Sequence, residues 1–263
     1  MRQQNTCNWI FELDEYKEWE NGDNNALWIH GIPGSGKSVL VSNIIDHLRQ
    51  QATANRRAGD YALTYCYCDF TDHAATEPPN IIRTLLVQAL QPNHWECTSS
   101  SVEEFQDLLD MINRGQAPPR NIQYLLQLFE RACTAALGAS ITRAVVVIDA
   151  LDECSNRPDL LAFITRLAEN EKISILVTSR HEQDMIEKLE RFSQISMASQ
   201  QTNSLADMEL YLSEELKTAK WDHVRGSIRE EIIETLLKDS EDNMYHMPSR
   251  TRIPPMTDHF YIL

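Results

Sequence analysis

The sequence predicts an α/β fold with a mostly parallel sheet, and two observations lead to this class. Apolar runs that fit buried strands alternate with segments of helical periodicity, which is the pattern of strand–helix–strand units. With 263 residues and 42% hydrophobic content, the chain can form one large core and a smaller appendage. The predicted strands are 26–31, 61–70, 144–149, 173–179 and a short one at 193–197, and the predicted helices are 38–51, 80–91, 121–137 and 158–170.

The first elements are the clearest. The run "ALWIHG" (26–31) fits a buried strand. The helix predicted after it carries apolar residues at helical spacing, namely Val39, Leu40, Ile44, Ile45 and Leu48. The second strand is rich in residues that favour strands, and Cys66 and Cys68 alternate in it, so both are expected to face the core.

The later elements follow the same alternation. Pro78 and Pro79 come just before the helix predicted at 80–91. Residues 92–120 are polar and irregular around one weak helix, and they end at the break "GQAPPR". An amphipathic helix follows at 121–137, and "AVVVID" and "ISILVTS" then supply two more buried strands.

The domain organisation predicted from these elements has four parts. Residues 1–24 lead into the core, and residues 25–200 form it. Residues 201–240 hold amphipathic helices with no strand between them, which predicts a small helical appendage. Residues 241–263 have no apolar period and follow an acidic run, so they are expected to form an irregular, poorly ordered tail.

Composition argues against several classes of partner. The 24 basic and 39 acidic side chains give a formal net charge of −15, which disfavours nucleic acid and anionic membrane surfaces. No apolar run reaches the length of a membrane span, and the first residues lack the layout of a secretory signal. The six cysteines show no CxxC pair. They are expected to be free thiols of a cytoplasmic protein.

Residues 31–38, "GIPGSGKS", fit the phosphate-binding pattern GxxxxGK[ST] between a predicted strand and a predicted helix. Gly31, Gly34 and Gly36 are expected to take unusual dihedrals that turn backbone N–H groups toward phosphate oxygens. Lys37 can reach the β- and γ-phosphates, and the Ser38 hydroxyl can ligate Mg²⁺. The residues predicted to bind the nucleotide are Gly31, Ile32, Pro33, Gly34, Ser35, Gly36, Lys37, Ser38 and Val39.

The stretch "AVVVIDALDEC" (144–154) places three carboxylates at the end of a buried run. Proteins with a phosphate loop hold Mg²⁺ through an acidic residue at the end of a second strand. Asp149 is therefore predicted to be a metal residue together with Ser38, and the alternative is a strand that simply ends in a polar turn. Asp152 and Glu153 are candidates to orient or activate an attacking water, with Glu153 slightly favoured.

A positively charged side chain follows a third predicted strand. "ILVTSRH" (175–181) is a buried run that ends in Thr178, Ser179 and Arg180. Parallel strands deliver their carboxyl ends to the same crevice, so Arg180 can sense or stabilise the charge of a γ-phosphate. A surface arginine at a strand end fits the spacing equally well.

With these motifs the chain resembles the NACHT family of signalling NTPases, and within it the nephrocystin-like N-terminal type found in fungal NOD-like proteins. The resemblance covers about residues 5–240. It rests on six segments: "TCNWI" (6–10), "LWIHGIPGSGKSVL" (27–40), "YCYCDFTD" (65–72), "IIRTLLVQAL" (81–90), "VVVIDALDEC" (145–154) and "ILVTSRHE" (175–182).

The resemblance implies a P-loop NTPase three-layer sandwich that acts as an ATP- or GTP-driven switch in signal transduction and innate immunity. It assigns Gly31 to Ser38 as the Walker A loop, Asp149 as the Walker B magnesium residue and Arg180 as the sensor arginine. Asp152 and Glu153 match the distal acidic pair, and "TCNWI" matches a segment near the adenine. Protein partners are implied through effector or repeat regions outside this sequence, and a homo-oligomer is a further expectation.

The sequence departs from the family after the helix predicted at 228–238. The family places a Gly-Met-Phe motif and a winged helix there, whereas this chain continues from Met244 as "YHMPSRTRIPPMTDHFYIL". The departure predicts a truncated or mis-spliced gene product, or a changed reading frame, after about Asn243. The helical lid is then expected to be incomplete.

Three classes of function stay open. The leading one is a switch that binds ATP and Mg²⁺ and hydrolyses the nucleotide slowly, with Lys37, Asp152, Glu153 and Arg180 as catalytic residues. The second is a non-hydrolysing interaction module, and the third is a small-molecule kinase, which is disfavoured because no arginine-rich lid follows the third strand. ATP is preferred over GTP because no [NT]KxD motif follows that strand.

Overall fold

In the part of the chain that the structure describes, five strands form one sheet in the order β2–β3–β4–β1–β5, and every neighbouring pair is parallel. The computed structural model describes residues 6–54, 61–72, 76–90, 121–136, 143–218, 221, 224 and 226–245. The strands are β1 (Ala26–His30), β2 (Tyr61–Tyr67), β3 (Arg143–Asp149), β4 (Ile173–Ser179) and β5 (Ser193–Ser196). The predicted α/β class is confirmed.

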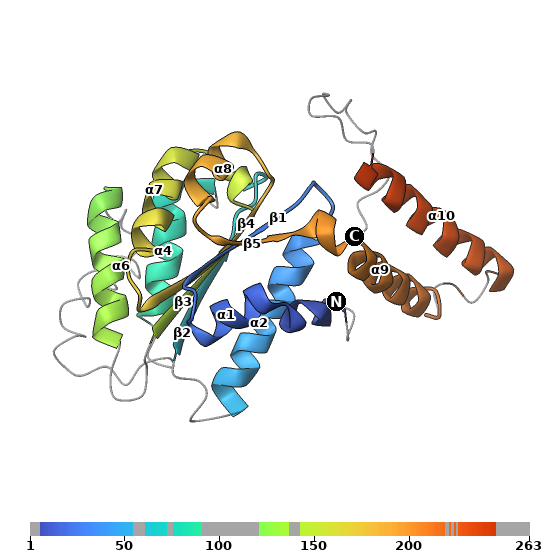
Figure 1. The fold of residues 1–263 in the computed structure, drawn as a ribbon, viewed down its shortest axis with the longest axis horizontal. Helices are drawn as coiled ribbons and strands as arrows, with labels where there is room; N and C mark the ends of the chain where they lie inside the picture. Colours follow the sequence, from blue (N-terminus) through green and yellow to red (C-terminus); the bar gives the residue numbers. More distant parts are fainter. Residues whose placement is uncertain are drawn as a thin grey trace. The chain divides into compact units, whose positions relative to one another are not determined.

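Helices cover both faces of the sheet and make three layers, with α1 and α2 on one face and α4, α6, α7 and α8 on the other (Figure 1). The helices of this layered unit are α1 (Asp14–Asn21), α2 (Lys37–Ala54), α4 (Pro78–Ala89), α6 (Ile122–Ala136), α7 (Arg157–Leu167) and α8 (Gln183–Leu189). Among the described residues this unit also has the short 3-10 helices η1 (Asn8–Glu12), η3 (Leu151–Glu153) and η4 (Met197–Gln200).

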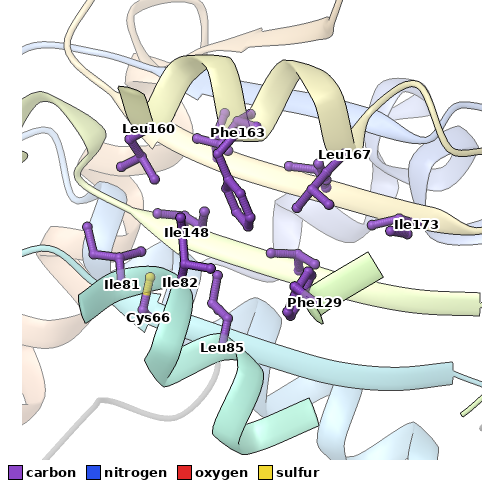
Figure 2. Close-up of a cluster of buried hydrophobic side chains, with 14 of the residues drawn as sticks. Cys66, Ile81, Ile82, Leu85, Phe129, Ile148, Leu160, Phe163, Leu167 and Ile173 are labelled. Carbon is purple, nitrogen blue, oxygen red and sulfur yellow. The ribbon is translucent and has the colours of Figure 1, made fainter. Parts of the chain in front are cut away.

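Two hydrophobic cores lie between these layers because side chains of a strand alternate between its two faces. In β3, for example, Val146 and Ile148 face one core while Val145 and Val147 face the other. The larger core packs α4, α6 and α7 against the sheet (Figure 2), and Phe129 and Phe163 meet there at 5.9 Å between ring centroids. Because both faces of the central strands are buried, these strands appear in the sequence as continuous apolar runs.

The chain divides into two compact units, one through Ser204 and one from Leu205. The second unit contains most of α9 (Gln201–Glu215) and all of α10 (Gly226–Tyr245). Residues 241–245 are therefore helical and do not belong to an irregular tail as predicted. No proline or glycine lies between Gly226 and Pro248, so nothing in this stretch forces the helix to stop at 240. Residues 246–263 lie outside the described part of the chain.

Several element boundaries differ from the prediction. Pro78 and Pro79 lie inside the first turn of α4, where proline is tolerated because the N–H groups have no partner within the helix. Val39 is 48% exposed, whereas Val41 is buried. The buried stripe of α2 thus leaves out the residue that directly follows the phosphate loop. The irregular segment predicted at 92–120 falls outside the described residues.

The predicted lead-in is structured from residue 6 onward, and Arg143 ties it to the sheet. The Arg143 guanidinium donates to the carbonyl oxygens of Trp19 (3.1 Å) and Glu20 at the end of α1, and to the Ser174 hydroxyl of β4 (3.1 Å). Burial lowers the pKa of Arg143 from its ordinary value. One side chain therefore satisfies last-turn carbonyls of α1 that the helix itself leaves without donors.

We expect Arg143→Lys to lower the free energy of unfolding by about 1–3 kcal/mol, because a single ammonium cannot reach all three acceptors. Urea denaturation measures this change, and hydrogen exchange should show faster opening of α1. The matched control is Arg166→Lys, since Arg166 forms ion pairs with Glu130 and Glu169 while its side chain is 58% exposed. That change should stay within about 0.5 kcal/mol. Equal losses in both variants would contradict the role given to Arg143.

Candidate functional site

The predicted site residues gather where β1, β3 and β4 end. The strands are parallel, and β4 lies between β1 and β3. The register pairs His30 with Ser179 and Ile148 with Val177, so the three strands finish at nearly the same height. The phosphate loop, Asp149 and Arg180 consequently share one edge of the sheet, as the sequence predicted.

The phosphate loop leaves β1 after His30 and enters α2 at Lys37. Gly34 and Gly36 have φ values of 77° and 84°, a region that side chains rarely occupy, so these two positions need glycine for their dihedrals. Gly31 needs glycine for a different reason. A Cβ there would lie 2.7 Å from the Met197 Cβ and 2.8 Å from the Ser35 Oγ, so the expectation of unusual dihedrals is wrong for Gly31, and close packing explains that residue.

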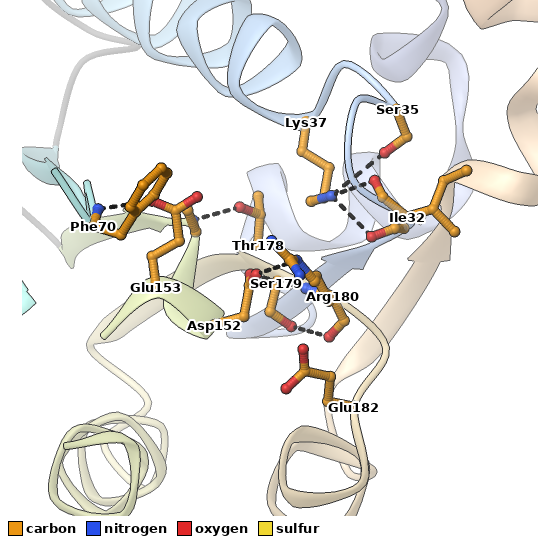
Figure 3. A network of polar contacts seen from close by, with 12 residues as sticks. Ile32, Ser35, Lys37, Phe70, Asp152, Glu153, Thr178, Ser179, Arg180 and Glu182 are labelled. Carbon is orange, nitrogen blue, oxygen red and sulfur yellow. Dashed lines mark hydrogen bonds and ion pairs between the residues drawn. The ribbon is translucent and has the colours of Figure 1, made fainter. Parts of the chain in front are cut away.

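Lys37 lies over the loop that it follows. Its Nζ donates to the carbonyl oxygens of Gly31 (2.8 Å) and Ile32 (2.9 Å), and to Ser35 Oγ at 3.4 Å (Figure 3). Burial lowers the pKa of Lys37, and the carboxylate of Asp152 is the largest influence that opposes this shift. The ammonium thus lies in a cradle formed by the backbone of the phosphate loop. Phosphate oxygens are stronger acceptors than these carbonyl oxygens and can replace them.

The remaining loop residues surround this cradle. Ser35 is buried, Ile32 is half-buried, and Pro33 is exposed. Ser38 is exposed in the first turn of α2, next to Val39. The helix N-terminus and the exposed hydroxyl are therefore accessible to an anion and its cation.

Asp149 is held by a residue of the neighbouring strand. It is 2% exposed at the end of β3, and the Thr178 Oγ1 of β4 donates to its Oδ1. The same Oγ1 accepts the Ala150 N–H at 2.9 Å. Ala150 has φ 58° and ψ 51°, a left-handed conformation that turns the chain sharply away from Asp149 into η3.

The two other carboxylates point to different donors. Asp152 forms an ion pair with Arg180, 2.8 Å from Oδ2 to Nε, and its Oδ1 accepts the Arg180 N–H at 3.0 Å (Figure 3). Glu153 accepts the backbone N–H of Phe70 through Oε2 at 3.0 Å. The side chain of Asp152 is 5% exposed and that of Arg180 is 46% exposed. Both predicted catalytic carboxylates are therefore engaged with protein donors.

An aromatic cluster lies beside the loop at the ends of β1 and β4. The rings of His30 and His181 are 4.4 Å apart, and the His181 ring stacks on Trp28 at 5.6 Å. The indole of Trp28 donates to the Ser179 hydroxyl at 2.8 Å. Burial, with smaller contributions from His181 and Lys37, lowers the pKa of His30 to about 4. His30 is thus neutral at pH 7 and adds no positive charge beside Lys37.

Sequence reasoning placed Thr178 at a strand end but gave it no role, and it missed the Phe70 N–H. A hydroxyl residue two positions before Arg180 was visible in the sequence. Its contact with Asp149 depends on the strand order, which places β4 beside β3. The Phe70 contact is made by a backbone group, which residue identity does not reveal.

Oxygen donors of the kind that Mg²⁺ prefers are present at the edge. Mg²⁺ is usually held by one or two carboxylates together with waters and phosphates. Asp149 supplies a buried carboxylate and Ser38 an exposed hydroxyl, which fits this donor set. Within the described ranges no group of three or more His, Cys, Asp and Glu side chains is placed to hold a metal by itself.

A glycine-rich loop between a buried strand and a helix, with a strand-end aspartate beside it, defines the P-loop NTPase class of fold. The sequence also matches the family described as Nephrocystin 3, N-terminal, over residues 5–180, and the chain belongs to this family. The predicted recognition as a NACHT-type, nephrocystin-like protein is confirmed.

One curated relative is the vegetative incompatibility protein HET-E-1 of Podospora anserina, 27% identical over 201 residues that cover 74% of this chain and 14% of that protein. The chain thus spans a small part of that relative's length. Similar solved structures include the Aeropyrum pernix ORC1 protein in complex with DNA, at 14% identity and TM-score 0.43, covering 95% of this chain and 67% of the other. Another is C. elegans PCH-2, at 14% identity and TM-score 0.39, covering 90% and 56%.

No helix of the described residues has both the length and the apolar character to cross a membrane.

We expect Ala150→Val to lower the free energy of unfolding by about 1–3 kcal/mol, because a β-branched residue fits the left-handed conformation poorly. Ala150→Gly is the control. Glycine avoids the cost of about 1 kcal/mol that alanine has in the left-handed conformation, which stabilises the folded state. Glycine also raises the conformational entropy of the unfolded chain, which lowers the free energy of unfolding by a similar amount. The two effects nearly cancel. Urea denaturation of both variants tests this, and a valine variant as stable as the glycine variant would show that the turn is not constrained.

Proposed function

We propose that this chain is a nucleotide-binding switch that binds ATP, or GTP, with Mg²⁺ and hydrolyses it slowly to control assembly with protein partners. The observation that carries the proposal is the convergence of the phosphate loop, Asp149 and the Arg180–Asp152 ion pair at one edge of the sheet. Membership of the nephrocystin 3 N-terminal family supports nucleotide binding. The similarity to a vegetative incompatibility protein supports a signalling role in a fungal, innate-immune context.

The proposed roles follow from the contacts. The Gly34 and Gly36 turns present loop N–H groups to phosphate oxygens, and Lys37 exchanges its loop carbonyls for those oxygens. Asp149 and Ser38 hold Mg²⁺, which neutralises charge on the bound phosphates. Val39 is exposed in the first helical turn, where it can contact the nucleotide.

Arg180 gives the site a means to distinguish a triphosphate from a diphosphate. In this structure its Nε binds Asp152, and nearly half of its side chain is exposed. A γ-phosphate competes with Asp152 for the guanidinium, because phosphate and carboxylate are both strong acceptors for arginine. Transfer of Arg180 to the nucleotide frees the Asp152 carboxylate, which couples the identity of the nucleotide to the conformation of η3.

One observation favours a second candidate, a non-hydrolysing nucleotide-binding module. Asp152 binds Arg180 through both carboxylate oxygens, and Glu153 accepts the Phe70 N–H through Oε2, so protein donors occupy part of the acceptor capacity of each carboxylate. In the switch, a carboxylate that leaves its donor gains acceptor capacity for an attacking water, which fits slow hydrolysis. Unchanged ATP after long incubation with protein that binds it would support the second candidate.

The wider setting is proposed on chemical grounds. A formal charge of −15 disfavours nucleic acid and anionic membranes as partners. Protein partners through effector or repeat regions, a homo-oligomer and a cytoplasmic location fit the proposed signalling role. Identification of the nucleotide released from purified protein by chromatography would decide between ATP and GTP.

We expect Lys37→Ala to weaken ATP binding at least about a hundredfold, because several charge-assisted contacts to phosphate are lost. Isothermal titration calorimetry with ATP and Mg²⁺ measures the affinity. Lys172→Ala is the matched control, since Lys172 is an exposed lysine just before β4 begins, and it should bind like the wild type. An unchanged affinity in Lys37→Ala would refute the assignment of the loop.

A second comparison should distinguish the roles of the Asp149 and Glu153 carboxylates. Asp149→Asn is expected to weaken Mg²⁺-dependent binding about tenfold or more, whereas Glu153→Gln should spare binding and slow hydrolysis about a hundredfold. Calorimetry gives the first quantity and release of inorganic phosphate gives the second. Equal loss of binding in both variants would end this division of roles.

A further inference from the structure

Three consecutive residues at the end of β4 each contact a different partner. Thr178 contacts Asp149, Ser179 accepts from Trp28, and Arg180 pairs with Asp152. The first of these contacts is the one between Thr178 and Asp149. It joins a fully buried side chain of one strand to the buried carboxylate of the next.

The chemistry of the Thr178 contact fixes the direction of its hydrogen. A threonine hydroxyl has one hydrogen to donate and two lone pairs to accept. The Ala150 N–H, 2.9 Å from Oγ1, can only donate, and it occupies a lone pair. The hydrogen is thus available for Oδ1 of Asp149, which as an ionised carboxylate can only accept.

These two hydrogen bonds involve the residues on either side of the Asp149–Ala150 peptide bond. The hydroxyl holds the side chain of Asp149 and the backbone of Ala150 together. The left-handed turn at Ala150 and the rotamer of Asp149 are therefore set by a single atom of β4. The register, which pairs Ile148 with Val177, brings Thr178 to this position and leaves Ser179 one step beyond it.

We propose that Thr178 is a positioning residue for the metal site, which orients the Asp149 carboxylate for Mg²⁺ bound with the nucleotide. The inference rests on the proposed function, because it assumes that Asp149 serves a nucleotide-bound cation. A hydroxyl that orients a metal-binding carboxylate from outside the metal's own ligands affects metal affinity strongly, by about ten- to a hundredfold when removed. Nucleotide affinity without metal does not depend on it.

The experiment measures binding of a non-hydrolysable ATP analogue by calorimetry, in Mg²⁺ over a range of concentrations and in EDTA. Thr178→Val keeps the shape and removes the hydroxyl. It should raise the Mg²⁺ concentration for half-maximal enhancement about tenfold or more and leave the affinity in EDTA unchanged. Thr178→Ser restores the hydroxyl and should titrate like the wild type.

Ser179→Ala is the matched control. It removes a neighbouring buried hydroxyl that accepts from the indole of Trp28 and donates to the carbonyl oxygen of Arg180. Neither partner is Asp149, so the variant should lose stability in thermal melts while its Mg²⁺ dependence stays that of the wild type. If Thr178→Val does not fold, Thr178→Cys serves instead, because a thiol is a weak donor of similar size, and it should show an intermediate shift.

The outcomes separate the two proposals. If wild-type protein binds the analogue with Mg²⁺ dependence and Thr178→Val or Thr178→Cys keeps that dependence, the role of Thr178 is wrong and the nucleotide site stands. If Ser179→Ala shifts the Mg²⁺ dependence as much as Thr178→Val, the effect is general to the strand end and the role is also wrong. If the wild type shows no binding in either condition, the proposed function itself fails, and the inference fails with it.

Discussion

The parallel order of the sheet is the constraint on which the site depends. Because β4 lies between β1 and β3 and all three run the same way, the phosphate loop, Asp149 and Arg180 reach one edge from three distant parts of the sequence. Parallel strands need crossover segments, and α2, α4, α6 and α7 lie in those crossovers, where they cover both faces. The same helices that build the two cores therefore align the strand ends that carry the chemistry.

Three carboxylates can stand beside a hydrophobic core only if each has a partner, since burial of an unpaired charge is costly. The structure gives each one a separate donor. Asp149 has the Thr178 hydroxyl, Asp152 has Arg180, and Glu153 has a backbone N–H. Two of these partners, Thr178 and Arg180, lie at the end of β4, and the third is the backbone of Phe70 after β2.

Much of the fold was predictable because periodicity and glycine patterns are local. The strands and the phosphate loop were found from apolar runs and the GxxxxGK[ST] spacing, whereas the short helices α1 and α8 were missed because seven or eight residues carry little periodic signal. The site was predictable in its residues but not in its contacts. The packing of Gly31 against Met197, the bond from Thr178 to Asp149 and the Phe70 donor all depend on which elements are neighbours, which residue identity alone does not state.

The pairing of Arg180 with Asp152 has a consequence for how a nucleotide could change the protein. Arg180 holds Asp152 by both its side chain and its backbone, and the carbonyl oxygen of Asp152 is itself bound by Arg157. Arg157 also pairs with Glu182, just before α8. A ligand that draws the Arg180 guanidinium away removes one member of a chain of contacts that runs from η3 through α7 to α8. The Arg180–Asp152 pair thus contacts η3 directly, and Arg157 connects η3 to the start of α8.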